Sequence, residues 1–149
     1  MSCTTDILIS IRRTVKLYEY MLKEVCEKYQ LTQIEADIIS FLQNNPGKDT
    51  AKDIAELRML SKGNVSQAVE QLIQRSLLRR QQDTADRRKI HLSLLPKAEP
   101  IIKEIDKIRN EFFASVFWGF SKAERDQYAT FNDRLMLNIE AAMKRGGKA

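Results

Sequence analysis

The chain has 149 residues, close to the length of one domain, and can bury most of its unfolded surface without disulfides. Hydrophobic residues make up 43% and charged residues 30%, a balance that excludes a disordered chain. Its longest uncharged stretches, 38–47 and 112–121, are too short for the ~20 residues of a membrane span, and we find no secretory signal. We expect a cytoplasmic protein with no membrane partner.

The net charge of +5 is concentrated in one part of the chain. Eight Lys or Arg and three Asp or Glu lie between Arg58 and His91, so this segment carries the whole excess. Such a distribution favours a surface that neutralises phosphates. The alternative is a chance surplus of charge on a solvated face.

The chain has two cysteines, Cys3 and Cys26, and one histidine, His91. These are too few for a four-ligand Cys/His zinc site, and a chain of this size has little need of a disulfide. We find no nucleophile elbow, phosphate loop or zinc-protease motif, and five glycines are few for a cofactor cradle. We therefore expect no metal, no cofactor and no enzymatic activity.

The N-terminal third predicts two helices. Apolar residues at steps of three and four indicate a first helix over about 5–29, capped by Thr4 or Thr5. Its stripe consists of Ile7, Ile11, Val15, Tyr18, Leu22, Val25 and Tyr29. Thr32 and Glu35 form a capping box that opens a second helix, and Asn45-Pro46-Gly47 ends it.

Two helices and a hairpin follow. Thr50 caps a short helix with Ile54 and Leu57 facing inward, and Ser61 caps a longer helix that reaches about Arg75. The apolar face of the longer helix consists of Val65, Ala68, Val69, Leu72 and Ile73, and its polar face is rich in amides. Residues 77–82 and 89–94 predict two antiparallel strands joined by 83–88.

The C-terminal third predicts two more helices. Pro96 opens a long helix that ends near Gly119, and Ser121 with Glu124 forms a capping box for the last one. The tail from Lys144 to Ala149 is expected to be frayed. The terminal helices carry longer apolar stripes than the middle of the chain can cover, so we expect a partner chain to bury the rest.

This order of elements is that of a winged helix-turn-helix, and the residues resemble the MarR family of bacterial transcriptional regulators from Leu31 to about Leu94. The matching motifs are Leu31-Thr32-x-x-Glu35, Ile54-Ala55, Val65-Ser66-x-x-Val69-x-x-Leu72, Leu77-Leu78-x-Arg80 and Asp83-x-x-Asp86-Arg87-Arg88. The predicted fold is mainly α with a small β-hairpin (α+β): a winged helix-turn-helix flanked by long dimerisation helices.

The resemblance implies a homodimer in which residues 1–149 form one unit. Helices over 5–29 and 96–145 would pair the two chains, and 32–94 would form the DNA-binding module. The expected dimer contacts are Ile7, Ile11, Val15, Phe112, Val116, Phe131, Leu135 and Ile139.

The resemblance also implies double-stranded DNA as a partner. The helix from Ser61 would enter the major groove, where amides can read adenine edges, and the wing at 83–89 would reach a minor groove. The expected DNA contacts are Lys62, Asn64, Ser66, Gln67, Gln71, Arg80, Arg87, Arg88 and Lys89.

The wing departs from the family pattern. Family wings often read Asp-x-Arg-Asp-x-Arg, and the middle arginine is Ala85 here, so Arg87 is the candidate to replace it. For Arg88, a pair with Asp83 or Asp86 competes with a DNA contact. We expect His91 to face solvent beside the hairpin.

One branch of the family senses oxidants through a cysteine in the first helix. Leu8 occupies that position here, and Cys26 lies in a helical pattern where a small buried residue is expected. We therefore do not expect a peroxide sensor.

The family implies a repressor of a pseudo-palindromic operator, located in the bacterial cytoplasm and on the nucleoid when bound to DNA. A small-molecule effector would release it, although the sequence does not specify the ligand. Tyr18, Arg13 and Phe41 are candidates for an effector pocket, with core packing as the alternative for the two aromatics. A different class of function also stays open: a helical adaptor whose winged module binds protein without specific DNA binding.

Overall fold

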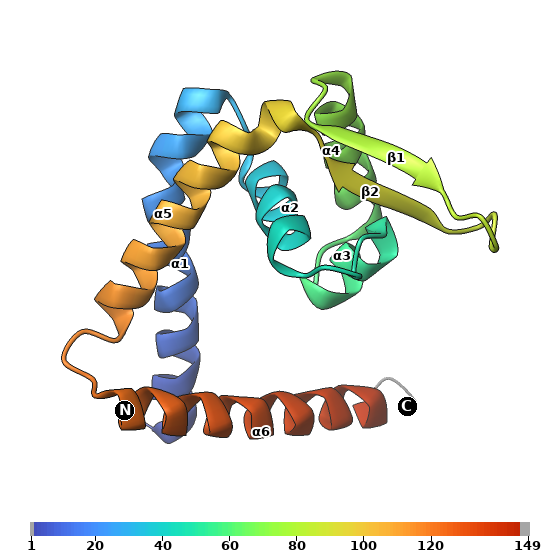
Figure 1. Ribbon diagram of the computed structural model, residues 1–149. Coiled ribbons are helices and arrows are strands. Elements are labelled where there is room, and N and C mark those ends of the chain that lie inside the picture. Colours follow the sequence, from blue (N-terminus) through green and yellow to red (C-terminus); the bar gives the residue numbers. More distant parts are fainter. Residues whose placement is uncertain (1, 147–149) are drawn as a thin grey trace. The chain divides into compact units, whose positions relative to one another are not determined.

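Side-chain caps set the start of several helices in the computed structural model, which describes residues 2–146 (Figure 1). The elements are α1 (Cys3–Tyr29), α2 (Gln33–Asn44), α3 (Ala51–Leu57), α4 (Lys62–Gln74), β1 (Leu78–Gln82), β2 (Ile90–Leu94), a 3-10 turn (Pro96–Ala98), α5 (Glu99–Val116) and α6 (Lys122–Gly146). The capping boxes predicted at Thr32 and Ser121 are both present. Thr50 also forms one, with Asp53.

The core lies where α2, α3 and α4 meet the C-terminal half of α1, the first half of α5 and the base of the hairpin. Its largest fully buried side chains are Leu22, Ile38, Ile39, Ile54, Leu72, Leu77, Leu78, Ile105 and Val65. Each helix contributes a single apolar face, so the hydrophobic effect fixes how the helix is rotated about its axis. The predicted apolar face of α4 is confirmed, because its residues are buried or packed against the core.

The two strands form an antiparallel hairpin, as predicted. Leu78 pairs with Leu94 at its base, and Gln82 pairs with Ile90 near its tip. Only Leu78 and Leu92 are buried, so the base is packed and the distal part is exposed. The Leu92 amide also donates to the Asp49 carbonyl at 2.8 Å, which ties β2 to the segment before α3. In Figure 1 the strands extend away from α3 and α4.

The chain forms two compact units, and the boundary between them lies after Phe112. The first unit holds the winged helix-turn-helix. The second holds α6, which has no buried residue over its 25 residues. Within residues 2–146, no helix combines the length and the hydrophobicity that crossing a membrane requires.

Several predicted boundaries were wrong. Ser2, rather than Thr4 or Thr5, caps α1. Pro96 opens a 3-10 turn before α5 begins. Residues 144–146 continue α6 instead of fraying, and the remainder of the predicted tail, 147–149, lies outside the described residues.

Leu57 was also predicted wrongly, because 57% of it is exposed. Met59, with a φ of 55°, turns the chain directly after α3, and the Leu60 amide donates to the Ala55 carbonyl. Leu60 therefore packs against the core near the end of this short helix. A helical period cannot reveal a turn of the chain two residues after the helix ends.

Candidate DNA-binding interface

The exposed face of α4 carries short side chains and almost no charge. Ser61 accepts a hydrogen bond from the Asn64 amide at 3.2 Å and so starts the helix. Because one face is held in the core, the opposite face points outward. All five α4 residues predicted to contact DNA are exposed: Lys62, Asn64, Ser66, Gln67 and Gln71. Asn and Gln amides can make paired hydrogen bonds to adenine.

The wing is a turn organised by one carboxylate. Asp83 accepts from the backbone amides of Ala85 at 2.9 Å and Asp86 at 2.7 Å. The Asp83 amide in turn donates to the Lys89 carbonyl at 2.9 Å, which closes the loop. The loop is therefore ordered without the side chain of Arg87, which is exposed. Lys89 is exposed as well.

Arg88 forms the intramolecular pair that was predicted as one alternative. Its Nε lies 3.4 Å from the Asp86 carboxylate, and its backbone amide donates to the same carboxylate at 3.0 Å. The Arg88 side chain is nevertheless 93% exposed. An ion pair this exposed contributes little to stability, so it leaves the guanidinium free to exchange Asp86 for a phosphate.

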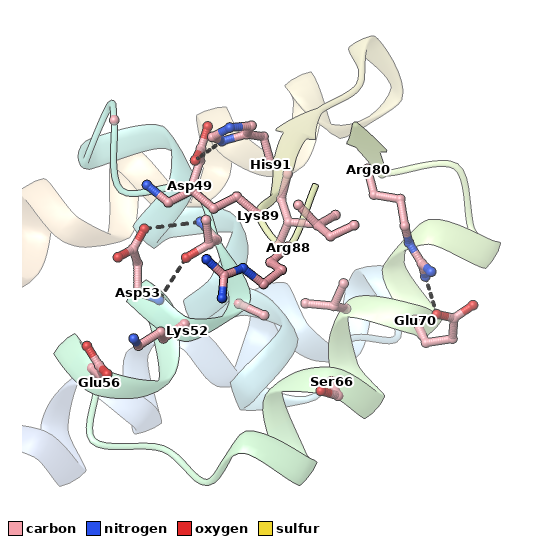
Figure 2. Close-up of a pocket in the computed structure, with 16 residues that line it drawn as sticks. Asp49, Lys52, Asp53, Glu56, Ser66, Glu70, Arg80, Arg88, Lys89 and His91 are labelled. Atoms are coloured by element: carbon pink, nitrogen blue, oxygen red, sulfur yellow. Dashed lines mark hydrogen bonds and ion pairs between the residues drawn. The ribbon is translucent and has the colours of Figure 1, made fainter. Parts of the chain in front are cut away.

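Arg80, also predicted to contact DNA, has a partner within the chain. Its guanidinium forms an ion pair with Glu70 of α4, and Figure 2 shows the two side chains meeting between β1 and α4. The pair links the hairpin to α4. Local sequence patterns could not predict this contact because the two residues belong to different elements.

Two further arginines of the charged segment hold the fold together. Arg58 pairs with Asp37 of α2 at 3.2 Å. Arg75 donates to the carbonyls of Tyr29 and Gln30 at the C-terminal end of α1, where a cation is favoured by the helix dipole. The charge excess between Arg58 and His91 is therefore divided between structural and exposed cations.

A groove of about 740 Å³ lies between the hairpin, α3 and α4. Figure 2 shows Asp49, Lys52 and Asp53 on its α3 side, facing Arg88 and Lys89 of the hairpin. Charges of both signs line the groove. Carboxylates would repel a phosphate deep inside it, which favours DNA contacts on the outer faces of α4 and the wing.

His91 is not solvent-facing as predicted. It is half-buried, with Nδ1 2.7 Å from Asp49 and Nε2 2.7 Å from Asp83. Hydrogen bonds to Asp49 and Asp83 raise the pKa of His91 above its ordinary 6.5. The hydrogen bond from His91, helped by the amides of Asp86 and Ala85, lowers the pKa of Asp83 to about 2. The alternation of the strand predicted an outward side chain but could not predict these two partners.

A second cavity of about 310 Å³ lies between α1, α2 and α5. Its lining residues are Thr14, Val15, Tyr18, Asp37, Ser40, Phe41, Asn45, Arg58, Arg109 and Phe112. Tyr18 and Phe41 were the predicted aromatic candidates, and both also pack in or against the core. Arg13 is not among the lining residues, and the cations that line the cavity are Arg58 and Arg109.

Polar groups of this cavity are partly desolvated. Burial raises the pKa of Asp37 even though Arg58 lies beside it, and burial also raises the pKa of Tyr18. Arg109 donates to Ser40 Oγ at 3.0 Å, and Phe112 packs edge-on against Tyr18 with centroids 5.1 Å apart. The cavity can thus contact an aromatic ring and a charged group together. Phe112, predicted to lie in a dimer interface, contacts its own chain here.

In the part of the chain that the structure describes, no three His, Cys, Asp or Glu side chains gather in a way that could hold a metal ion.

A sequence model of the MarR family matches residues 29–89, which span the whole helix-turn-helix and most of the wing. Similar solved structures include a MarR-family regulator from Silicibacter pomeroyi, with 18% identity, a TM-score of 0.77, and coverage of 87% of this chain and 86% of that one. A MarR regulator from Methanosarcina mazei Go1 has 17% identity and a TM-score of 0.76, and the match covers 92% and 99% of the two chains.

Bordetella bronchiseptica BpsR has 21% identity and a TM-score of 0.67, and the match covers 88% of this chain and 98% of BpsR. DNA binding by BpsR is regulated by 6-hydroxynicotinic acid. At these identities the solved structures show a common fold, and the family match to the winged helix carries the assignment.

The winged helix-turn-helix of this chain, over residues 29–89, matches the MarR family of DNA-binding transcriptional regulators, and the solved MarR structures share its fold. The predicted family and fold class are both confirmed. The matched family consists of transcriptional regulators rather than enzymes, in agreement with the expectation from the sequence.

Cys26 tests the expectation that this chain does not sense oxidants through a cysteine. Cys26 is only 8% exposed, and burial raises its pKa, whereas Cys3 is exposed. Because the thiolate is the reactive form, we expect Cys26 to be alkylated at least about tenfold more slowly than Cys3 in the native protein. Mass spectrometry of a timed iodoacetamide reaction measures both rates. Fast modification of Cys26, together with release of DNA on oxidation, would contradict the expectation.

Proposed function

We propose that the protein is a homodimeric repressor that binds a pseudo-palindromic operator and is released by a small-molecule effector. The observation that carries this proposal is the pairing of an outward amide face on α4 with exposed cations on the adjacent wing. The first can read bases, and the second can neutralise phosphates. The proposed site of action is the bacterial cytoplasm, on the nucleoid when DNA is bound.

Exposed apolar side chains on α1 and α6 support the dimer. Ile7, Ile11 and Val15 are each more than half exposed, and in α6 Phe131 and Leu135 are too. Repeated exposure of large apolar residues along one helix is costly in water and is typical of an interface. We assign α1, α5 and α6 to dimerisation and residues 32–94 to DNA binding, with Val116 and Ile139 also in the interface.

Reading of the operator is assigned to the N-terminal half of α4. Residues there approach base edges when a recognition helix enters the major groove. Asn64 and Gln67 provide amides, Lys62 can read guanine or contact phosphate, and Ser66 and Gln71 lie on the same exposed face.

The wing supplies contacts that do not depend on sequence. Arg87 takes the place of the missing arginine at Ala85 and enters the adjacent minor groove. Arg88 and Lys89 flank it and lie near phosphate, while Arg80 first has to leave Glu70. Arginine favours a narrow minor groove because the electrostatic potential there is strongly negative.

The cavity between α1, α2 and α5 is the proposed effector site. A volume of about 310 Å³ fits a small molecule, and its aromatic lining with two arginines suits a planar ring bearing an anionic group. An occupant there touches both a dimerisation helix and α2 of the DNA-binding module. It can therefore shift the population between DNA-binding and non-binding dimers.

The dimer predicts a clear effect of charge on the apolar stripe of α1. Ile11→Glu should dissociate or unfold the protein, since an unpaired carboxylate in an apolar interface costs at least about 2 kcal/mol. Leu135→Glu in α6 should act in the same way. Sedimentation velocity at micromolar concentration measures the effect.

The matched control is Arg12→Glu, which introduces the same group one residue off the stripe and should remain dimeric. A wild-type protein that sediments as a folded monomer at this concentration would remove the dimer from the proposal.

Operator reading is tested by Asn64→Ala and Gln67→Ala. Each should weaken operator binding by about 1–3 kcal/mol and change binding to scrambled DNA little, because only base-edge contacts are lost. Gln74→Ala, an amide at the other end of α4, is the control. Fluorescence anisotropy over a range of salt concentrations gives both affinities.

Arg87→Ala tests the contribution of the wing in the same assay. It should weaken binding to both DNAs. It should also make the slope of log affinity against log salt shallower by the equivalent of about one phosphate contact per subunit. If Asn64→Ala and Gln67→Ala leave the operator-to-scrambled ratio unchanged, α4 is not the reading element. Binding to neither DNA would favour the protein-binding adaptor.

A further inference from the structure

His91 is held between two carboxylates that come from different parts of the chain. Asp49 lies just before α3, and its Oδ1 is 2.7 Å from Nδ1 of the ring. Asp83 opens the wing, and its Oδ1 is 2.7 Å from Nε2. The imidazole therefore bridges the helical part of the DNA-binding module and the wing.

The two contacts can be satisfied together in only one charge state of the ring. A neutral imidazole has one N–H donor and one lone pair, whereas an ionised carboxylate only accepts hydrogen bonds. A neutral ring could donate to one carboxylate, but the lone pair on its other nitrogen would point at the lone pairs of the second carboxylate. Only the imidazolium donates to Asp49 and Asp83 at once. The arrangement is thus complete only when His91 carries a proton on each nitrogen.

Asp83 connects this bridge to the conformation of the wing. Its Oδ2 accepts from the amides of Ala85 and Asp86, so one carboxylate both forms the turn and receives the ring. Arg87 and Arg88 directly follow that turn. The Leu92 amide and the Arg80–Glu70 pair hold the hairpin nearer its base, and the distal strands are otherwise exposed, so His91 is the side chain that fixes the wing turn itself to the segment before α3.

Other charged groups surround the bridge but do not replace it. From α3 the groove is lined by Lys52, Asp53 and Glu56, and from α4 by Glu70. The hairpin contributes Arg80, Arg88 and Lys89. Arg80 is paired with Glu70 and Arg88 with Asp86. Among the described residues, the hydrogen-bond partners of the ring nitrogens are the two carboxylates, Asp49 and Asp83.

We propose that His91 is a positioning residue for DNA binding: its imidazolium holds the wing against the segment before α3, and loss of its proton releases the wing and weakens DNA binding. This inference rests on the proposed role of the wing. It makes the protein's affinity for its operator fall as His91 loses its proton with rising pH.

The direction of the pH effect follows from the pKa shifts of His91 and Asp83. Its carboxylate partners raise the pKa of His91 above 6.5, so the contacts are complete below that value and are lost as pH rises through the raised value. The pKa of Asp83 is lowered to about 2, so its carboxylate stays ionised throughout the neutral range. The wing is therefore held at pH values below the raised pKa of His91 and released at pH values above it.

The experiment measures operator affinity and the protonation of His91 over the same pH range. Because the chain has one histidine, its ring gives a single set of imidazole resonances whose shifts report the titration directly. Between about pH 6 and about pH 9 we expect wild-type operator affinity to fall about three- to tenfold. The midpoint of this fall should coincide with the midpoint of the His91 titration.

Two substitutions of His91 separate positioning from folding. His91→Arg keeps a permanent cation with several donors, so its affinity should stay high and constant across the range. His91→Gln cannot donate to both carboxylates as a cation does, so its affinity should be low and constant. Circular dichroism checks that both fold.

Substitutions elsewhere test the path of the effect. Asp49→Asn should lower the pKa of His91 and move the affinity midpoint to lower pH. Arg87→Ala should flatten the pH response, because the contact that His91 positions is already gone. Gln67→Ala should lower operator affinity but keep the pH response, since Gln67 lies on α4 and the wing that His91 positions stays intact.

The proposal would be overturned by wild-type affinity that stays constant while His91 titrates. The same pH dependence in His91→Arg, or equal affinities of His91→Gln and His91→Arg at pH 6, would also overturn it. A wild-type protein that binds no DNA at any pH would instead contradict the proposed function, so the two failures are distinguishable.

Discussion

Burial of one face of α4 decides which of its residues can face DNA. Val65, Ala68, Val69 and Leu72 occupy the core between α2, α3 and the hairpin, and rotating the helix would expose them. Burying a side chain of this type contributes roughly 1–3 kcal/mol, so four together strongly oppose rotation. The reading surface is therefore a consequence of the core. The amide side chains of α4 therefore face outward without any contact of their own that holds them there.

The basic segment has two roles that its composition does not distinguish. Arg58 and Arg75 stabilise the module through Asp37 and the end of α1, and Arg80 joins the hairpin to α4 through Glu70. Lys62 and Arg87 remain exposed beside the reading face. In the proposed complex, the number of phosphates that each subunit neutralises is consequently smaller than the number of cations in the segment. Structural cations fix the relative position of the elements that carry the others.

The proposed regulation has two separate inputs to the same module. The cavity beside Tyr18 and Arg109 contacts α2, which packs directly against α4. His91 is proposed to act on the wing through Asp83, and neither of its ring hydrogen bonds goes to α4. Ligand and pH would thus change different contacts: the position of the reading helix in one case, and the phosphate and minor-groove contacts of the wing in the other.

Local features of the sequence were sufficient to predict most of the architecture. Thr32, Thr50 and Ser61 indicate helices because a cap and its partners lie within four residues, and periodicity identified the buried face of α4. Contacts between distant segments could not be predicted in this way. His91 was predicted to point outward because Asp49 lies 42 positions away, and the cavity cation Arg109 comes from a helix that local patterns could not place beside α2.

The central claim is that α4 and the wing of two chains act together on one symmetric operator. Footprinting on an operator selected from random DNA tests it most directly, with hydroxyl radicals to probe the sugars along the minor groove and dimethyl sulfate to probe guanine N7 in the major groove. The account predicts two equivalent half-sites with centres about 10 base pairs apart, or a multiple of that, each protected in the major groove and flanked by a protected minor groove. A single asymmetric footprint, or uniform protection that ignores sequence, would contradict it.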